Sequence, residues 1–335
     1  MSETLLDVRD LRVEFPGPPA VRAVDGASFD IRAGEALGVV GESGSGKTMA
    51  LRALVGLLPR SARLAGGTIV FEGMDLATAS PEQLRAVRGR SISMIFQEPM
   101  TALNPVMRIG EQIGEGPLVR LGYGRRRARE RALELMRLVG IPDPAERAEA
   151  YPHELSGGLR QRAMIAIALS MEPKLILCDE PTTALDVTIQ DQILKLLLSL
   201  RERLDVSIVF VSHDLAVIAQ TCQRVAVMYA GQVVETGPVE QVFREPRHPY
   251  TLSLLRSVPD VDNVRHQLTA IPGSPPDLAD PPSGCRFHPR CPFVQPDCVA
   301  GAFPLRPLGP ERATACIHPD AAAADVRREP VLAGG

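Results

Sequence analysis

The stretch Gly41-Glu42-Ser43-Gly44-Ser45-Gly46-Lys47-Thr48 decides which fold this sequence predicts. It follows an apolar run, 36–40, that is typical of a buried strand, and it precedes a segment, 49–58, with an apolar helical face. Glycines between a strand and a helix leave backbone N–H groups free to bind phosphate oxygens at the positive end of the helix dipole. We therefore predict a phosphate-binding loop in which Lys47 reaches the terminal phosphates and Thr48 offers a hydroxyl to Mg²⁺.

The composition is that of an ordinary globular protein. The chain has 335 residues, of which 45% are hydrophobic and 23% charged, so it can form one large domain with an appendage. Its net charge of −3 gives no reason to expect a nucleic-acid partner. No apolar run is long enough to span a bilayer, and the N-terminus lacks the basic start and apolar block of a secretory signal. We expect a cytoplasmic protein that reaches the membrane only through a partner.

Short apolar runs alternate with helical patterns, which predicts an α/β fold. Strands are expected at 5–15, 27–31, 36–40, 67–73, 91–96, 174–179 and 207–212, followed by a hairpin over 224–237 that turns at Ala230-Gly231. A helix begins after Ser80, because Pro81 and Gln83 complete a capping box. Further helices are expected at 125–139, 159–170, 187–204, 239–244 and 249–257.

Two changes of pattern indicate how the chain is divided. Residues from about 100 to 170 show helices without strands, which predicts an inserted helical subdomain. Beyond Val258 the many prolines leave little room for long helices or central strands. We therefore place a domain boundary near 258, between a nucleotide-binding domain, 1–258, and a C-terminal extension, 259–335.

Two acidic side chains end the strand predicted at 174–179. Open α/β sheets bind their ligands at the carboxyl ends of the strands, so Asp179 and Glu180 are candidates for a catalytic pair. Asp179 would hold Mg²⁺, and Glu180 would be the general base that polarises an attacking water. The alternative for this segment taken alone is a strand that simply ends in acidic loop residues.

A second glycine-rich helix start lies at Leu155–Gln161. Ser156 is a natural N-cap, and Gly157 and Gly158 expose N–H groups at a positive helix end, so the segment is a second anion site. Taken alone it is better explained as a capped helix. Gln97 and His213 are likewise ordinary polar residues at strand ends until they are read together with the other motifs.

Together these motifs resemble, in the same order along residues 5–257, those of the ATP-binding subunits of ABC transporters. The resemblance implies an ABC-type ATPase core, with a mainly parallel sheet flanked by helices, an antiparallel β-subdomain, the inserted helical subdomain and a Pro/Cys-rich extension. It identifies Gln97 with the Q-loop glutamine, Leu155–Gln161 with the signature motif, Asp179 and Glu180 with the Walker B pair, Ala184-Leu185-Asp186 with the D-loop, His213 with the switch histidine, and Phe15 with the aromatic that stacks on adenine.

The resemblance also implies ligands and roles. ATP and Mg²⁺ are the expected cofactors, with Thr48, Gln97 and Asp179 at the metal, and His213 at the γ-phosphate. In this family two nucleotide domains pair head to tail, so the signature motif of one chain covers the nucleotide of the other. The expected partners are a second ABC ATPase subunit, more typically a related chain in a heterodimer than another copy, two permease subunits and an extracytoplasmic solute-binding protein. The chain would then lie peripherally on the cytoplasmic face of the inner membrane.

The closer resemblance is to the dipeptide and oligopeptide importers, carried by residues 97–105, 248–251 and 271–276. Importers of nickel and of other small solutes share these segments, so nickel remains an alternative cargo. A soluble ABC ATPase acting on DNA or ribosomes is another alternative, although such proteins usually carry coiled-coil insertions or tandem ATPase units. A redox-responsive regulator is a third.

Four cysteines of the extension form a candidate metal site: Cys285, Cys291, Cys298 and Cys316. Their gaps of five, six and seventeen residues do not match a zinc finger, while four thiolates suit a [4Fe–4S] cluster. The segment 285–292 resembles the cluster-bearing tails of some peptide-importer ATPases. Zinc and free thiols remain alternatives, whereas Cys178 and Cys222 are expected to be small buried apolar residues.

Overall fold

The computed structural model describes residues 3–183, 185–257 and 270–328. The chain forms two compact units. We call residues 4–31, 36–78 and 212–335 the P-loop unit, because it holds the glycine-rich loop, and residues 1–3, 32–35 and 79–211 the helical unit. Ala184, the first residue of the expected D-loop, lies outside the described residues.

The P-loop unit contains two groups of strands. The first is a sheet in the order β2-β1-β4-β5, in which β4 is antiparallel to both β1 and β5. In the second, β9 lies parallel to β3 and antiparallel to β10, and β10 pairs in turn with β12. The bounds are β1 Thr4–Phe15, β2 Val21–Arg32, β3 Ala36–Val40, β4 Arg63–Phe71, β5 Met74–Asp75, β9 Arg224–Tyr229, β10 Gln232–Pro238, β11 Arg306–Pro307 and β12 Ala313–Thr314.

Every residue of β3 is buried, so the glycine-rich loop starts from a fixed strand. The predicted hairpin is also present, because β9 and β10 pair antiparallel around Ala230-Gly231. The helices of this unit are α1 Lys47–Leu54, α9 Leu215–Thr221, α10 Val239–Arg244, α11 Pro249–Arg256 and α12 Pro319–Arg328, with short 3₁₀ turns η2 His288–Arg290 and η3 Pro296–Val299.

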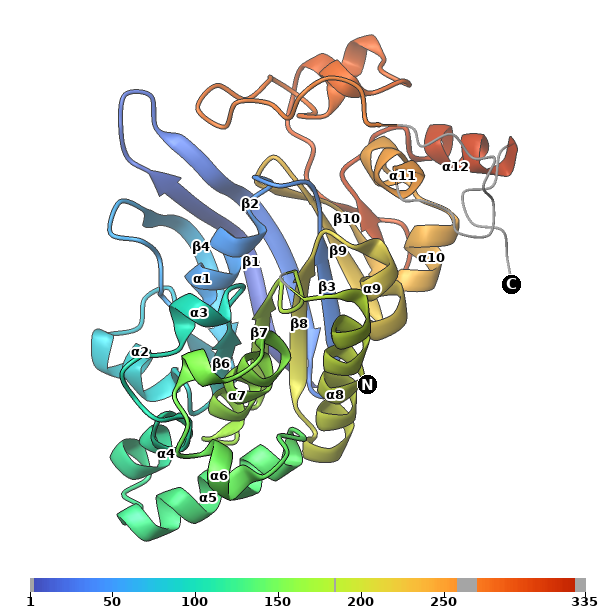
Figure 1. Cartoon of the computed structure of the whole chain (residues 1–335). Coiled ribbons are helices and arrows are strands. Elements are labelled where there is room, and N and C mark those ends of the chain that lie inside the picture. Colours follow the sequence, from blue (N-terminus) through green and yellow to red (C-terminus); the bar gives the residue numbers. More distant parts are fainter. Residues whose placement is uncertain (1–2, 184, 258–269, 329–335) are drawn as a thin grey trace. The chain divides into compact units, whose positions relative to one another are not determined.

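The extension is joined to this unit by strand pairing and by a helix. Strand β12 is hydrogen-bonded to β10 and to β11, and the backbone N–H of Ala315 donates to Val234 O at 2.8 Å. Helix α12 lies beside α11, where Leu252 packs with Ala322 and Val326 (Figure 1). The compact unit therefore runs across the boundary that the composition suggests.

The far end of the described extension forms a helix, which is compatible with the expectation that the prolines leave little room for long helices. Helix α12 has ten residues, because Pro319 occupies a helix start, where proline is tolerated, and the next proline is Pro330.

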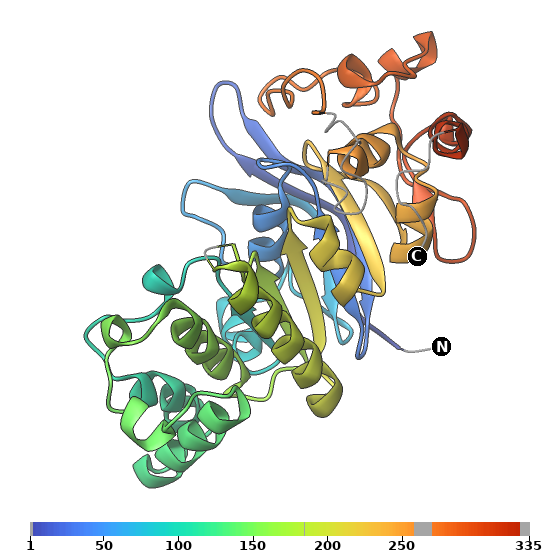
Figure 2. The same cartoon turned by 45° about the vertical axis from the view of Figure 1, so that its right-hand side comes forward.

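The helical unit combines three parallel strands with a bundle of helices. Strand β7 lies between β6 and β8, parallel to both, and its five residues are buried. Helices α4, α5 and α7 contact one another in the bundle of green ribbons in Figure 2. The bounds are α2 Pro81–Val87, β6 Ile92–Ile95, α3 Pro99–Ala102, α4 Ile109–Arg120, α5 Arg125–Leu138, α6 Pro144–Arg147, η1 Pro152–Glu154, α7 Gly157–Leu169, β7 Leu175–Asp179, α8 Val187–Leu204 and β8 Ser207–Ser212.

Candidate functional site

The glycine-rich loop of the P-loop unit has a backbone that other residues could not adopt. A Cβ atom at Gly41 would lie 2.1 Å from Met228 O, and one at Gly46 would lie 2.3 Å from Ala23 O. Gly46 also has φ +100°, in the left-handed region that favours glycine. The loop is therefore held close to neighbouring backbone on two sides.

Lys47 turns back over this loop at the start of α1. Its side chain is buried, and Nζ donates hydrogen bonds to Gly41 O at 2.7 Å and to Glu42 O at 2.9 Å. Helix α1 begins at this lysine, so its ammonium group and the first N–H groups of the helix lie in one small region. That combination of charge and donors suits a polyphosphate.

The helical unit brings Gln97 and Glu180 together. Gln97 Nε2 donates to Glu180 Oε2 at 3.0 Å, and the hydroxyl of Thr183 donates to the same oxygen at 2.9 Å. Glu180 also has φ +48°, which is unusual for a residue other than glycine and fixes the direction of the side chain just after β7. Asp179, the last residue of β7, is 2% exposed.

Two exposed helix starts of the helical unit carry the other predicted groups. Ser156 is the N-cap of α7, as predicted, and its hydroxyl accepts from the N–H of Leu159 at 3.4 Å. Gly158 packs closely against α8, because a Cβ atom there would lie 2.9 Å from a methyl group of Ile189. Asp186 caps α8 and accepts from the N–H of Ile189 at 3.0 Å.

The remaining predicted residues belong to the P-loop unit. Phe15 is half-buried at the end of β1. His213 is exposed and directly precedes Asp214, which caps α9 through the N–H groups of Ala216 and Val217. The structure thus gathers residues 41–48 within one unit and Gln97 with Glu180 within the other.

The four cysteines of the extension line one cavity. Its volume is about 20 Å³, which exceeds the ~10–15 Å³ that a single water needs. None of the four forms a disulfide. Burial raises the pKa of Cys285, of Cys291 to about 11 and of Cys316 to about 12, so these groups are neutral thiols at pH 7 unless a cation stabilises the thiolate.

His248 lines the same cavity and is 1% exposed. Its Nδ1 accepts from the backbone N–H of Tyr250 at 3.1 Å, so the ring proton is on Nε2. Burial lowers the pKa of this histidine to about 3, which keeps the ring neutral. Among the described residues Nε2 has no hydrogen-bond partner. The wall of the cavity therefore includes a buried N–H donor, that of His248 Nε2.

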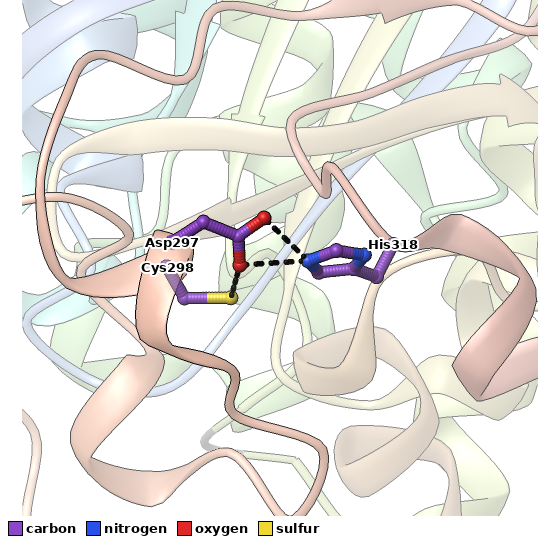
Figure 3. A group of neighbouring side chains, drawn as sticks. All are labelled: Asp297, Cys298 and His318. Atoms are coloured by element: carbon purple, nitrogen blue, oxygen red, sulfur yellow. Dashed lines mark hydrogen bonds and ion pairs between the residues drawn. The ribbon is translucent and has the colours of Figure 1, made fainter.

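A second donor group lies at the edge of this cavity, where Asp297, Cys298 and His318 meet (Figure 3). His318 Nε2 lies 2.9 and 3.1 Å from the two carboxylate oxygens of Asp297, and this contact lowers the pKa of the carboxyl group. In the described parts of the chain, these three side chains form the candidate metal-ligand group, because their donor atoms all lie within 4.8 Å of one another.

Comparison with known proteins shows the family to which the chain belongs. Residues 24–183 match the family model described as ABC transporter, and residues 234–298 match the model described as oligopeptide/dipeptide transporter, C-terminal region. A probable peptide ABC transporter ATP-binding protein of Sinorhizobium fredii is 49% identical over 94% of this chain and 95% of its own length. The chain belongs to the family of ABC transporter ATP-binding proteins.

Other members of this family are similarly close. The dipeptide transport ATP-binding protein of Bacillus subtilis is 50% identical over 87% of each chain, and that of Escherichia coli is 45% identical over 94% of this chain and 97% of its own. A solved ATP-binding cassette, a dimer in a post-hydrolysis state bound to ADP and Pi, superposes with a TM-score of 0.63 at 26% identity, covering 70% of this chain and 98% of its own. The chain is an ABC ATPase with the predicted fold. None of its described helices is long and apolar enough to cross a bilayer.

Sequence reasoning missed the residues that tie the extension to the glycine-rich loop. Arg290, Tyr250 and His248 all lie within segments that carry the family resemblance, but nothing in their local patterns assigned them a role. Their partners are distant along the chain: the carboxylate that accepts from Arg290 is 248 positions away. No local feature of the sequence separates these residues from other polar residues, because their burial and their partners depend on distant segments.

Proposed function

We propose that this chain energises the uptake of dipeptides or oligopeptides by hydrolysing ATP at the cytoplasmic face of the inner membrane. The proposal rests mainly on the C-terminal extension. It belongs to the same compact unit as the glycine-rich loop, and its beginning matches the C-terminal region of oligopeptide and dipeptide transporters. Relatives 45–50% identical to the chain are named for peptide or dipeptide transport.

The ATP phosphates bind residues 41–48 of the P-loop unit, with Lys47 neutralising the terminal phosphates and Phe15 stacking on adenine. Thr48, Gln97 and Asp179 supply oxygen donors to Mg²⁺, which prefers such hard ligands. The metal would neutralise charge on the phosphate oxygens. Lys47 and Thr48 begin helix α1 directly after the glycine-rich loop, and Asp179 ends strand β7.

Glu180 takes a proton from the attacking water, whose oxygen then bonds to the γ-phosphorus as the bond to the ADP oxygen breaks. The hydrogen bonds from Gln97 and Thr183 hold the carboxylate in one orientation before the water arrives. His213 donates to the γ-phosphate oxygens. Movement of Gln97 passes the nucleotide state to the helical subdomain, residues 100–170, which contacts the permeases.

The signature residues Ser156, Gly157 and Gly158, with Asp186, serve the nucleotide of a second ABC ATPase subunit, in a heterodimer. Two permeases and an extracytoplasmic solute-binding protein complete the importer. Ser156 and Asp186 are exposed, as residues that face a partner's nucleotide must be.

Replacing Ser156 with Ala tests this assignment. We expect ATP hydrolysis by the assembled transporter to fall about tenfold, the loss of one hydrogen bond at the transition state, while ATP binding to the isolated chain is unchanged. Ser80→Ala is the matched control, since Ser80 caps α2 in the same way. Both substitutions remove a helix cap worth ~1 kcal/mol, so equal effects on hydrolysis would show that only helix stability matters.

The cargo is tested by reconstitution. Vesicles that contain the chain, its partner ATPase and the permeases should hydrolyse ATP faster when the binding protein is loaded with a dipeptide, and should accumulate labelled dipeptide. If Ni²⁺ but not peptides stimulates ATP hydrolysis, the chain would instead serve a nickel importer. Hydrolysis that no solute or permease stimulates would favour a soluble ATPase.

We also propose that Cys285, Cys291, Cys298 and Cys316 hold a [4Fe–4S] cluster. Their thiols line one cavity, and His248 at its wall has a buried N–H donor of the kind that stabilises cluster sulfur. Tetrahedral zinc, with Zn–S bonds of about 2.3 Å, would place ligand sulfurs ~3.8 Å apart. In the described residues no three of these thiols gather within 4.8 Å, which favours a group larger than one ion. Such a cluster would supply one-electron chemistry or a structural cross-link.

A further inference from the structure

Among the described residues of the extension, Arg290 contacts the glycine-rich loop. Arg290 ends the turn η2, directly before Cys291, and its side chain is 5% exposed. Its Nη1 donates to Glu42 Oε2 at 2.8 Å and its Nη2 to Glu42 Oε1 at 3.0 Å. This is a two-bond, fork-to-fork pair, the geometry in which an arginine fixes the direction of a carboxylate as well as its charge. Glu42 is the second residue of the loop.

The other donors of Arg290 are also used, so the guanidinium cannot turn away easily. Nε donates to Pro272 O at 2.8 Å, and Nη1 donates to Tyr229 Oη at 3.2 Å. The guanidinium carbon lies 5.8 Å from the centre of the Tyr229 ring and 5.9 Å from that of Phe287. Arg290 is therefore held by the extension and by β9 before it contacts Glu42.

The backbone of Glu42 is held from the same side. Its N–H donates to Tyr250 Oη at 2.8 Å, and Tyr250 is fully buried in α11. The rings of Tyr250, Tyr229 and Phe287 pack against one another, with centroids 4.5 to 5.4 Å apart. An aromatic cluster formed by α11, β9 and the extension thus supports both contacts to one loop residue.

These contacts bear on the ammonium group that serves the phosphates. Lys47 Nζ donates to the carbonyl oxygens of Gly41 and Glu42, the residue that Arg290 holds. A shift of Glu42 therefore moves an acceptor of Lys47. The side chain of Glu42 points to Arg290 of the extension, and Tyr250 of α11 accepts from its N–H, so both groups of this loop residue are held from outside the loop.

We propose that Arg290 is a positioning residue for the phosphate-binding loop, and that nucleotide affinity depends on the extension through its pair with Glu42. The proposal rests on the assignment of residues 41–48 to the ATP phosphates made above. Arg290 is not a catalytic residue, because it acts on the nucleotide only through Glu42. Substituting Arg290 should therefore raise the Kd for nucleotide and the KM for ATP, whereas kcat at saturating ATP should change little.

The test is a double-mutant cycle on the full-length chain, read by the Kd of a fluorescent ATP analogue and by the Tm. We expect Arg290→Gln and Glu42→Gln each to weaken binding about tenfold. The double variant should bind no more weakly than either single variant, because both remove the same pair. Arg290→Lys should recover only part of the affinity, since an ammonium group cannot make the two-bond contact.

Arg256→Gln is the matched control. Arg256 pairs with Asp325 of α12 at 2.6 Å, with both side chains under a third exposed, and so also ties the extension to α11. It should lower the Tm without changing the Kd. If Arg290→Gln behaves in the same way, or if the effects of Arg290→Gln and Glu42→Gln multiply, the proposal is overturned. Should Arg290→Gln fail to fold, an unchanged Kd for Glu42→Gln overturns it as well.

A Lys47→Ala variant separates this proposal from the one on which it rests. If Lys47→Ala binds the analogue like the wild type, the phosphate-loop assignment itself fails. If Lys47→Ala loses binding and Arg290→Gln does not, the assignment stands and only the positioning role of Arg290 fails.

Discussion

Glu180→Gln is expected to lower ATP hydrolysis by at least about 10²-fold, because an amide cannot accept the proton of the attacking water. ATP binding should persist, since the phosphates are assigned to residues 41–48, and the substituted side chain can still accept hydrogen bonds from Gln97 and Thr183. Hydrolysis is measured on the assembled transporter by phosphate release, and binding is measured on the isolated chain. Turnover near the wild-type rate would refute the assignment of Glu180 as base.

The chain offers a close control for this substitution. Glu172 has φ +55°, nearly the backbone conformation of Glu180, and lies in the same unit, where its exposed carboxylate pairs with Arg131 at 2.8 Å. Glu172→Gln removes the same charge from the same kind of backbone, away from Gln97. We expect hydrolysis within about twofold of wild type, as for an ordinary surface substitution.

Replacing Cys291 and Cys298 together with Ser is expected to abolish iron binding. Anaerobically purified wild type should contain about four iron atoms per chain, the content of a cubane cluster, with matching inorganic sulfide and a broad visible absorbance. The double variant should lose iron, sulfide and colour together, because two of four thiolates cannot hold the cluster. Iron and sulfide analysis measures this without reference to ATPase activity.

Cys222→Ser controls for the loss of a thiol, because Cys222 lies outside the cavity, and it should keep its iron. Stoichiometric zinc in the wild type would refute the cluster. Zinc that is lost in His318→Ala but kept in Cys291→Ser would place a single ion at Asp297, Cys298 and His318 instead. Wild-type protein without any metal would leave the four cysteines as free thiols.

Much of the fold could be predicted because its signals are local. The strand 36–40, the helix 187–204 and the strand 207–212 occur at the predicted positions, since each is a continuous apolar or amphipathic pattern. The capping box at Ser80 is also confirmed, because its residues contact one another within a single turn. Residues 27–31 lie in a longer strand that begins at Val21, where pairing within the sheet outweighs the weak local pattern.

What could not be predicted depends on contacts between distant segments. Arg290 has no local feature that separates it from other arginines, and its role appears only when Glu42 lies opposite. Likewise, β12 is two residues long and carries no strand pattern, yet it pairs with β10 because that edge is available to it. The local sequence of the cysteines indicates a metal, whereas His248 at the cavity wall is found only from the structure.

The pairing of β12 with β10 determines how late in its synthesis the protein can complete its folding. The compact unit that starts at Thr4 includes Phe287 and Thr314, so its last contacts form only after these distant residues have left the ribosome. The buried carboxylate of Glu235 accepts from the backbone N–H groups of Arg247 and His248, but the cation that pairs with it, Arg312, is synthesised much later. Closing such long chain segments slows folding. The glycine-rich loop is thus translated well before the extension, yet it reaches its final form only together with it.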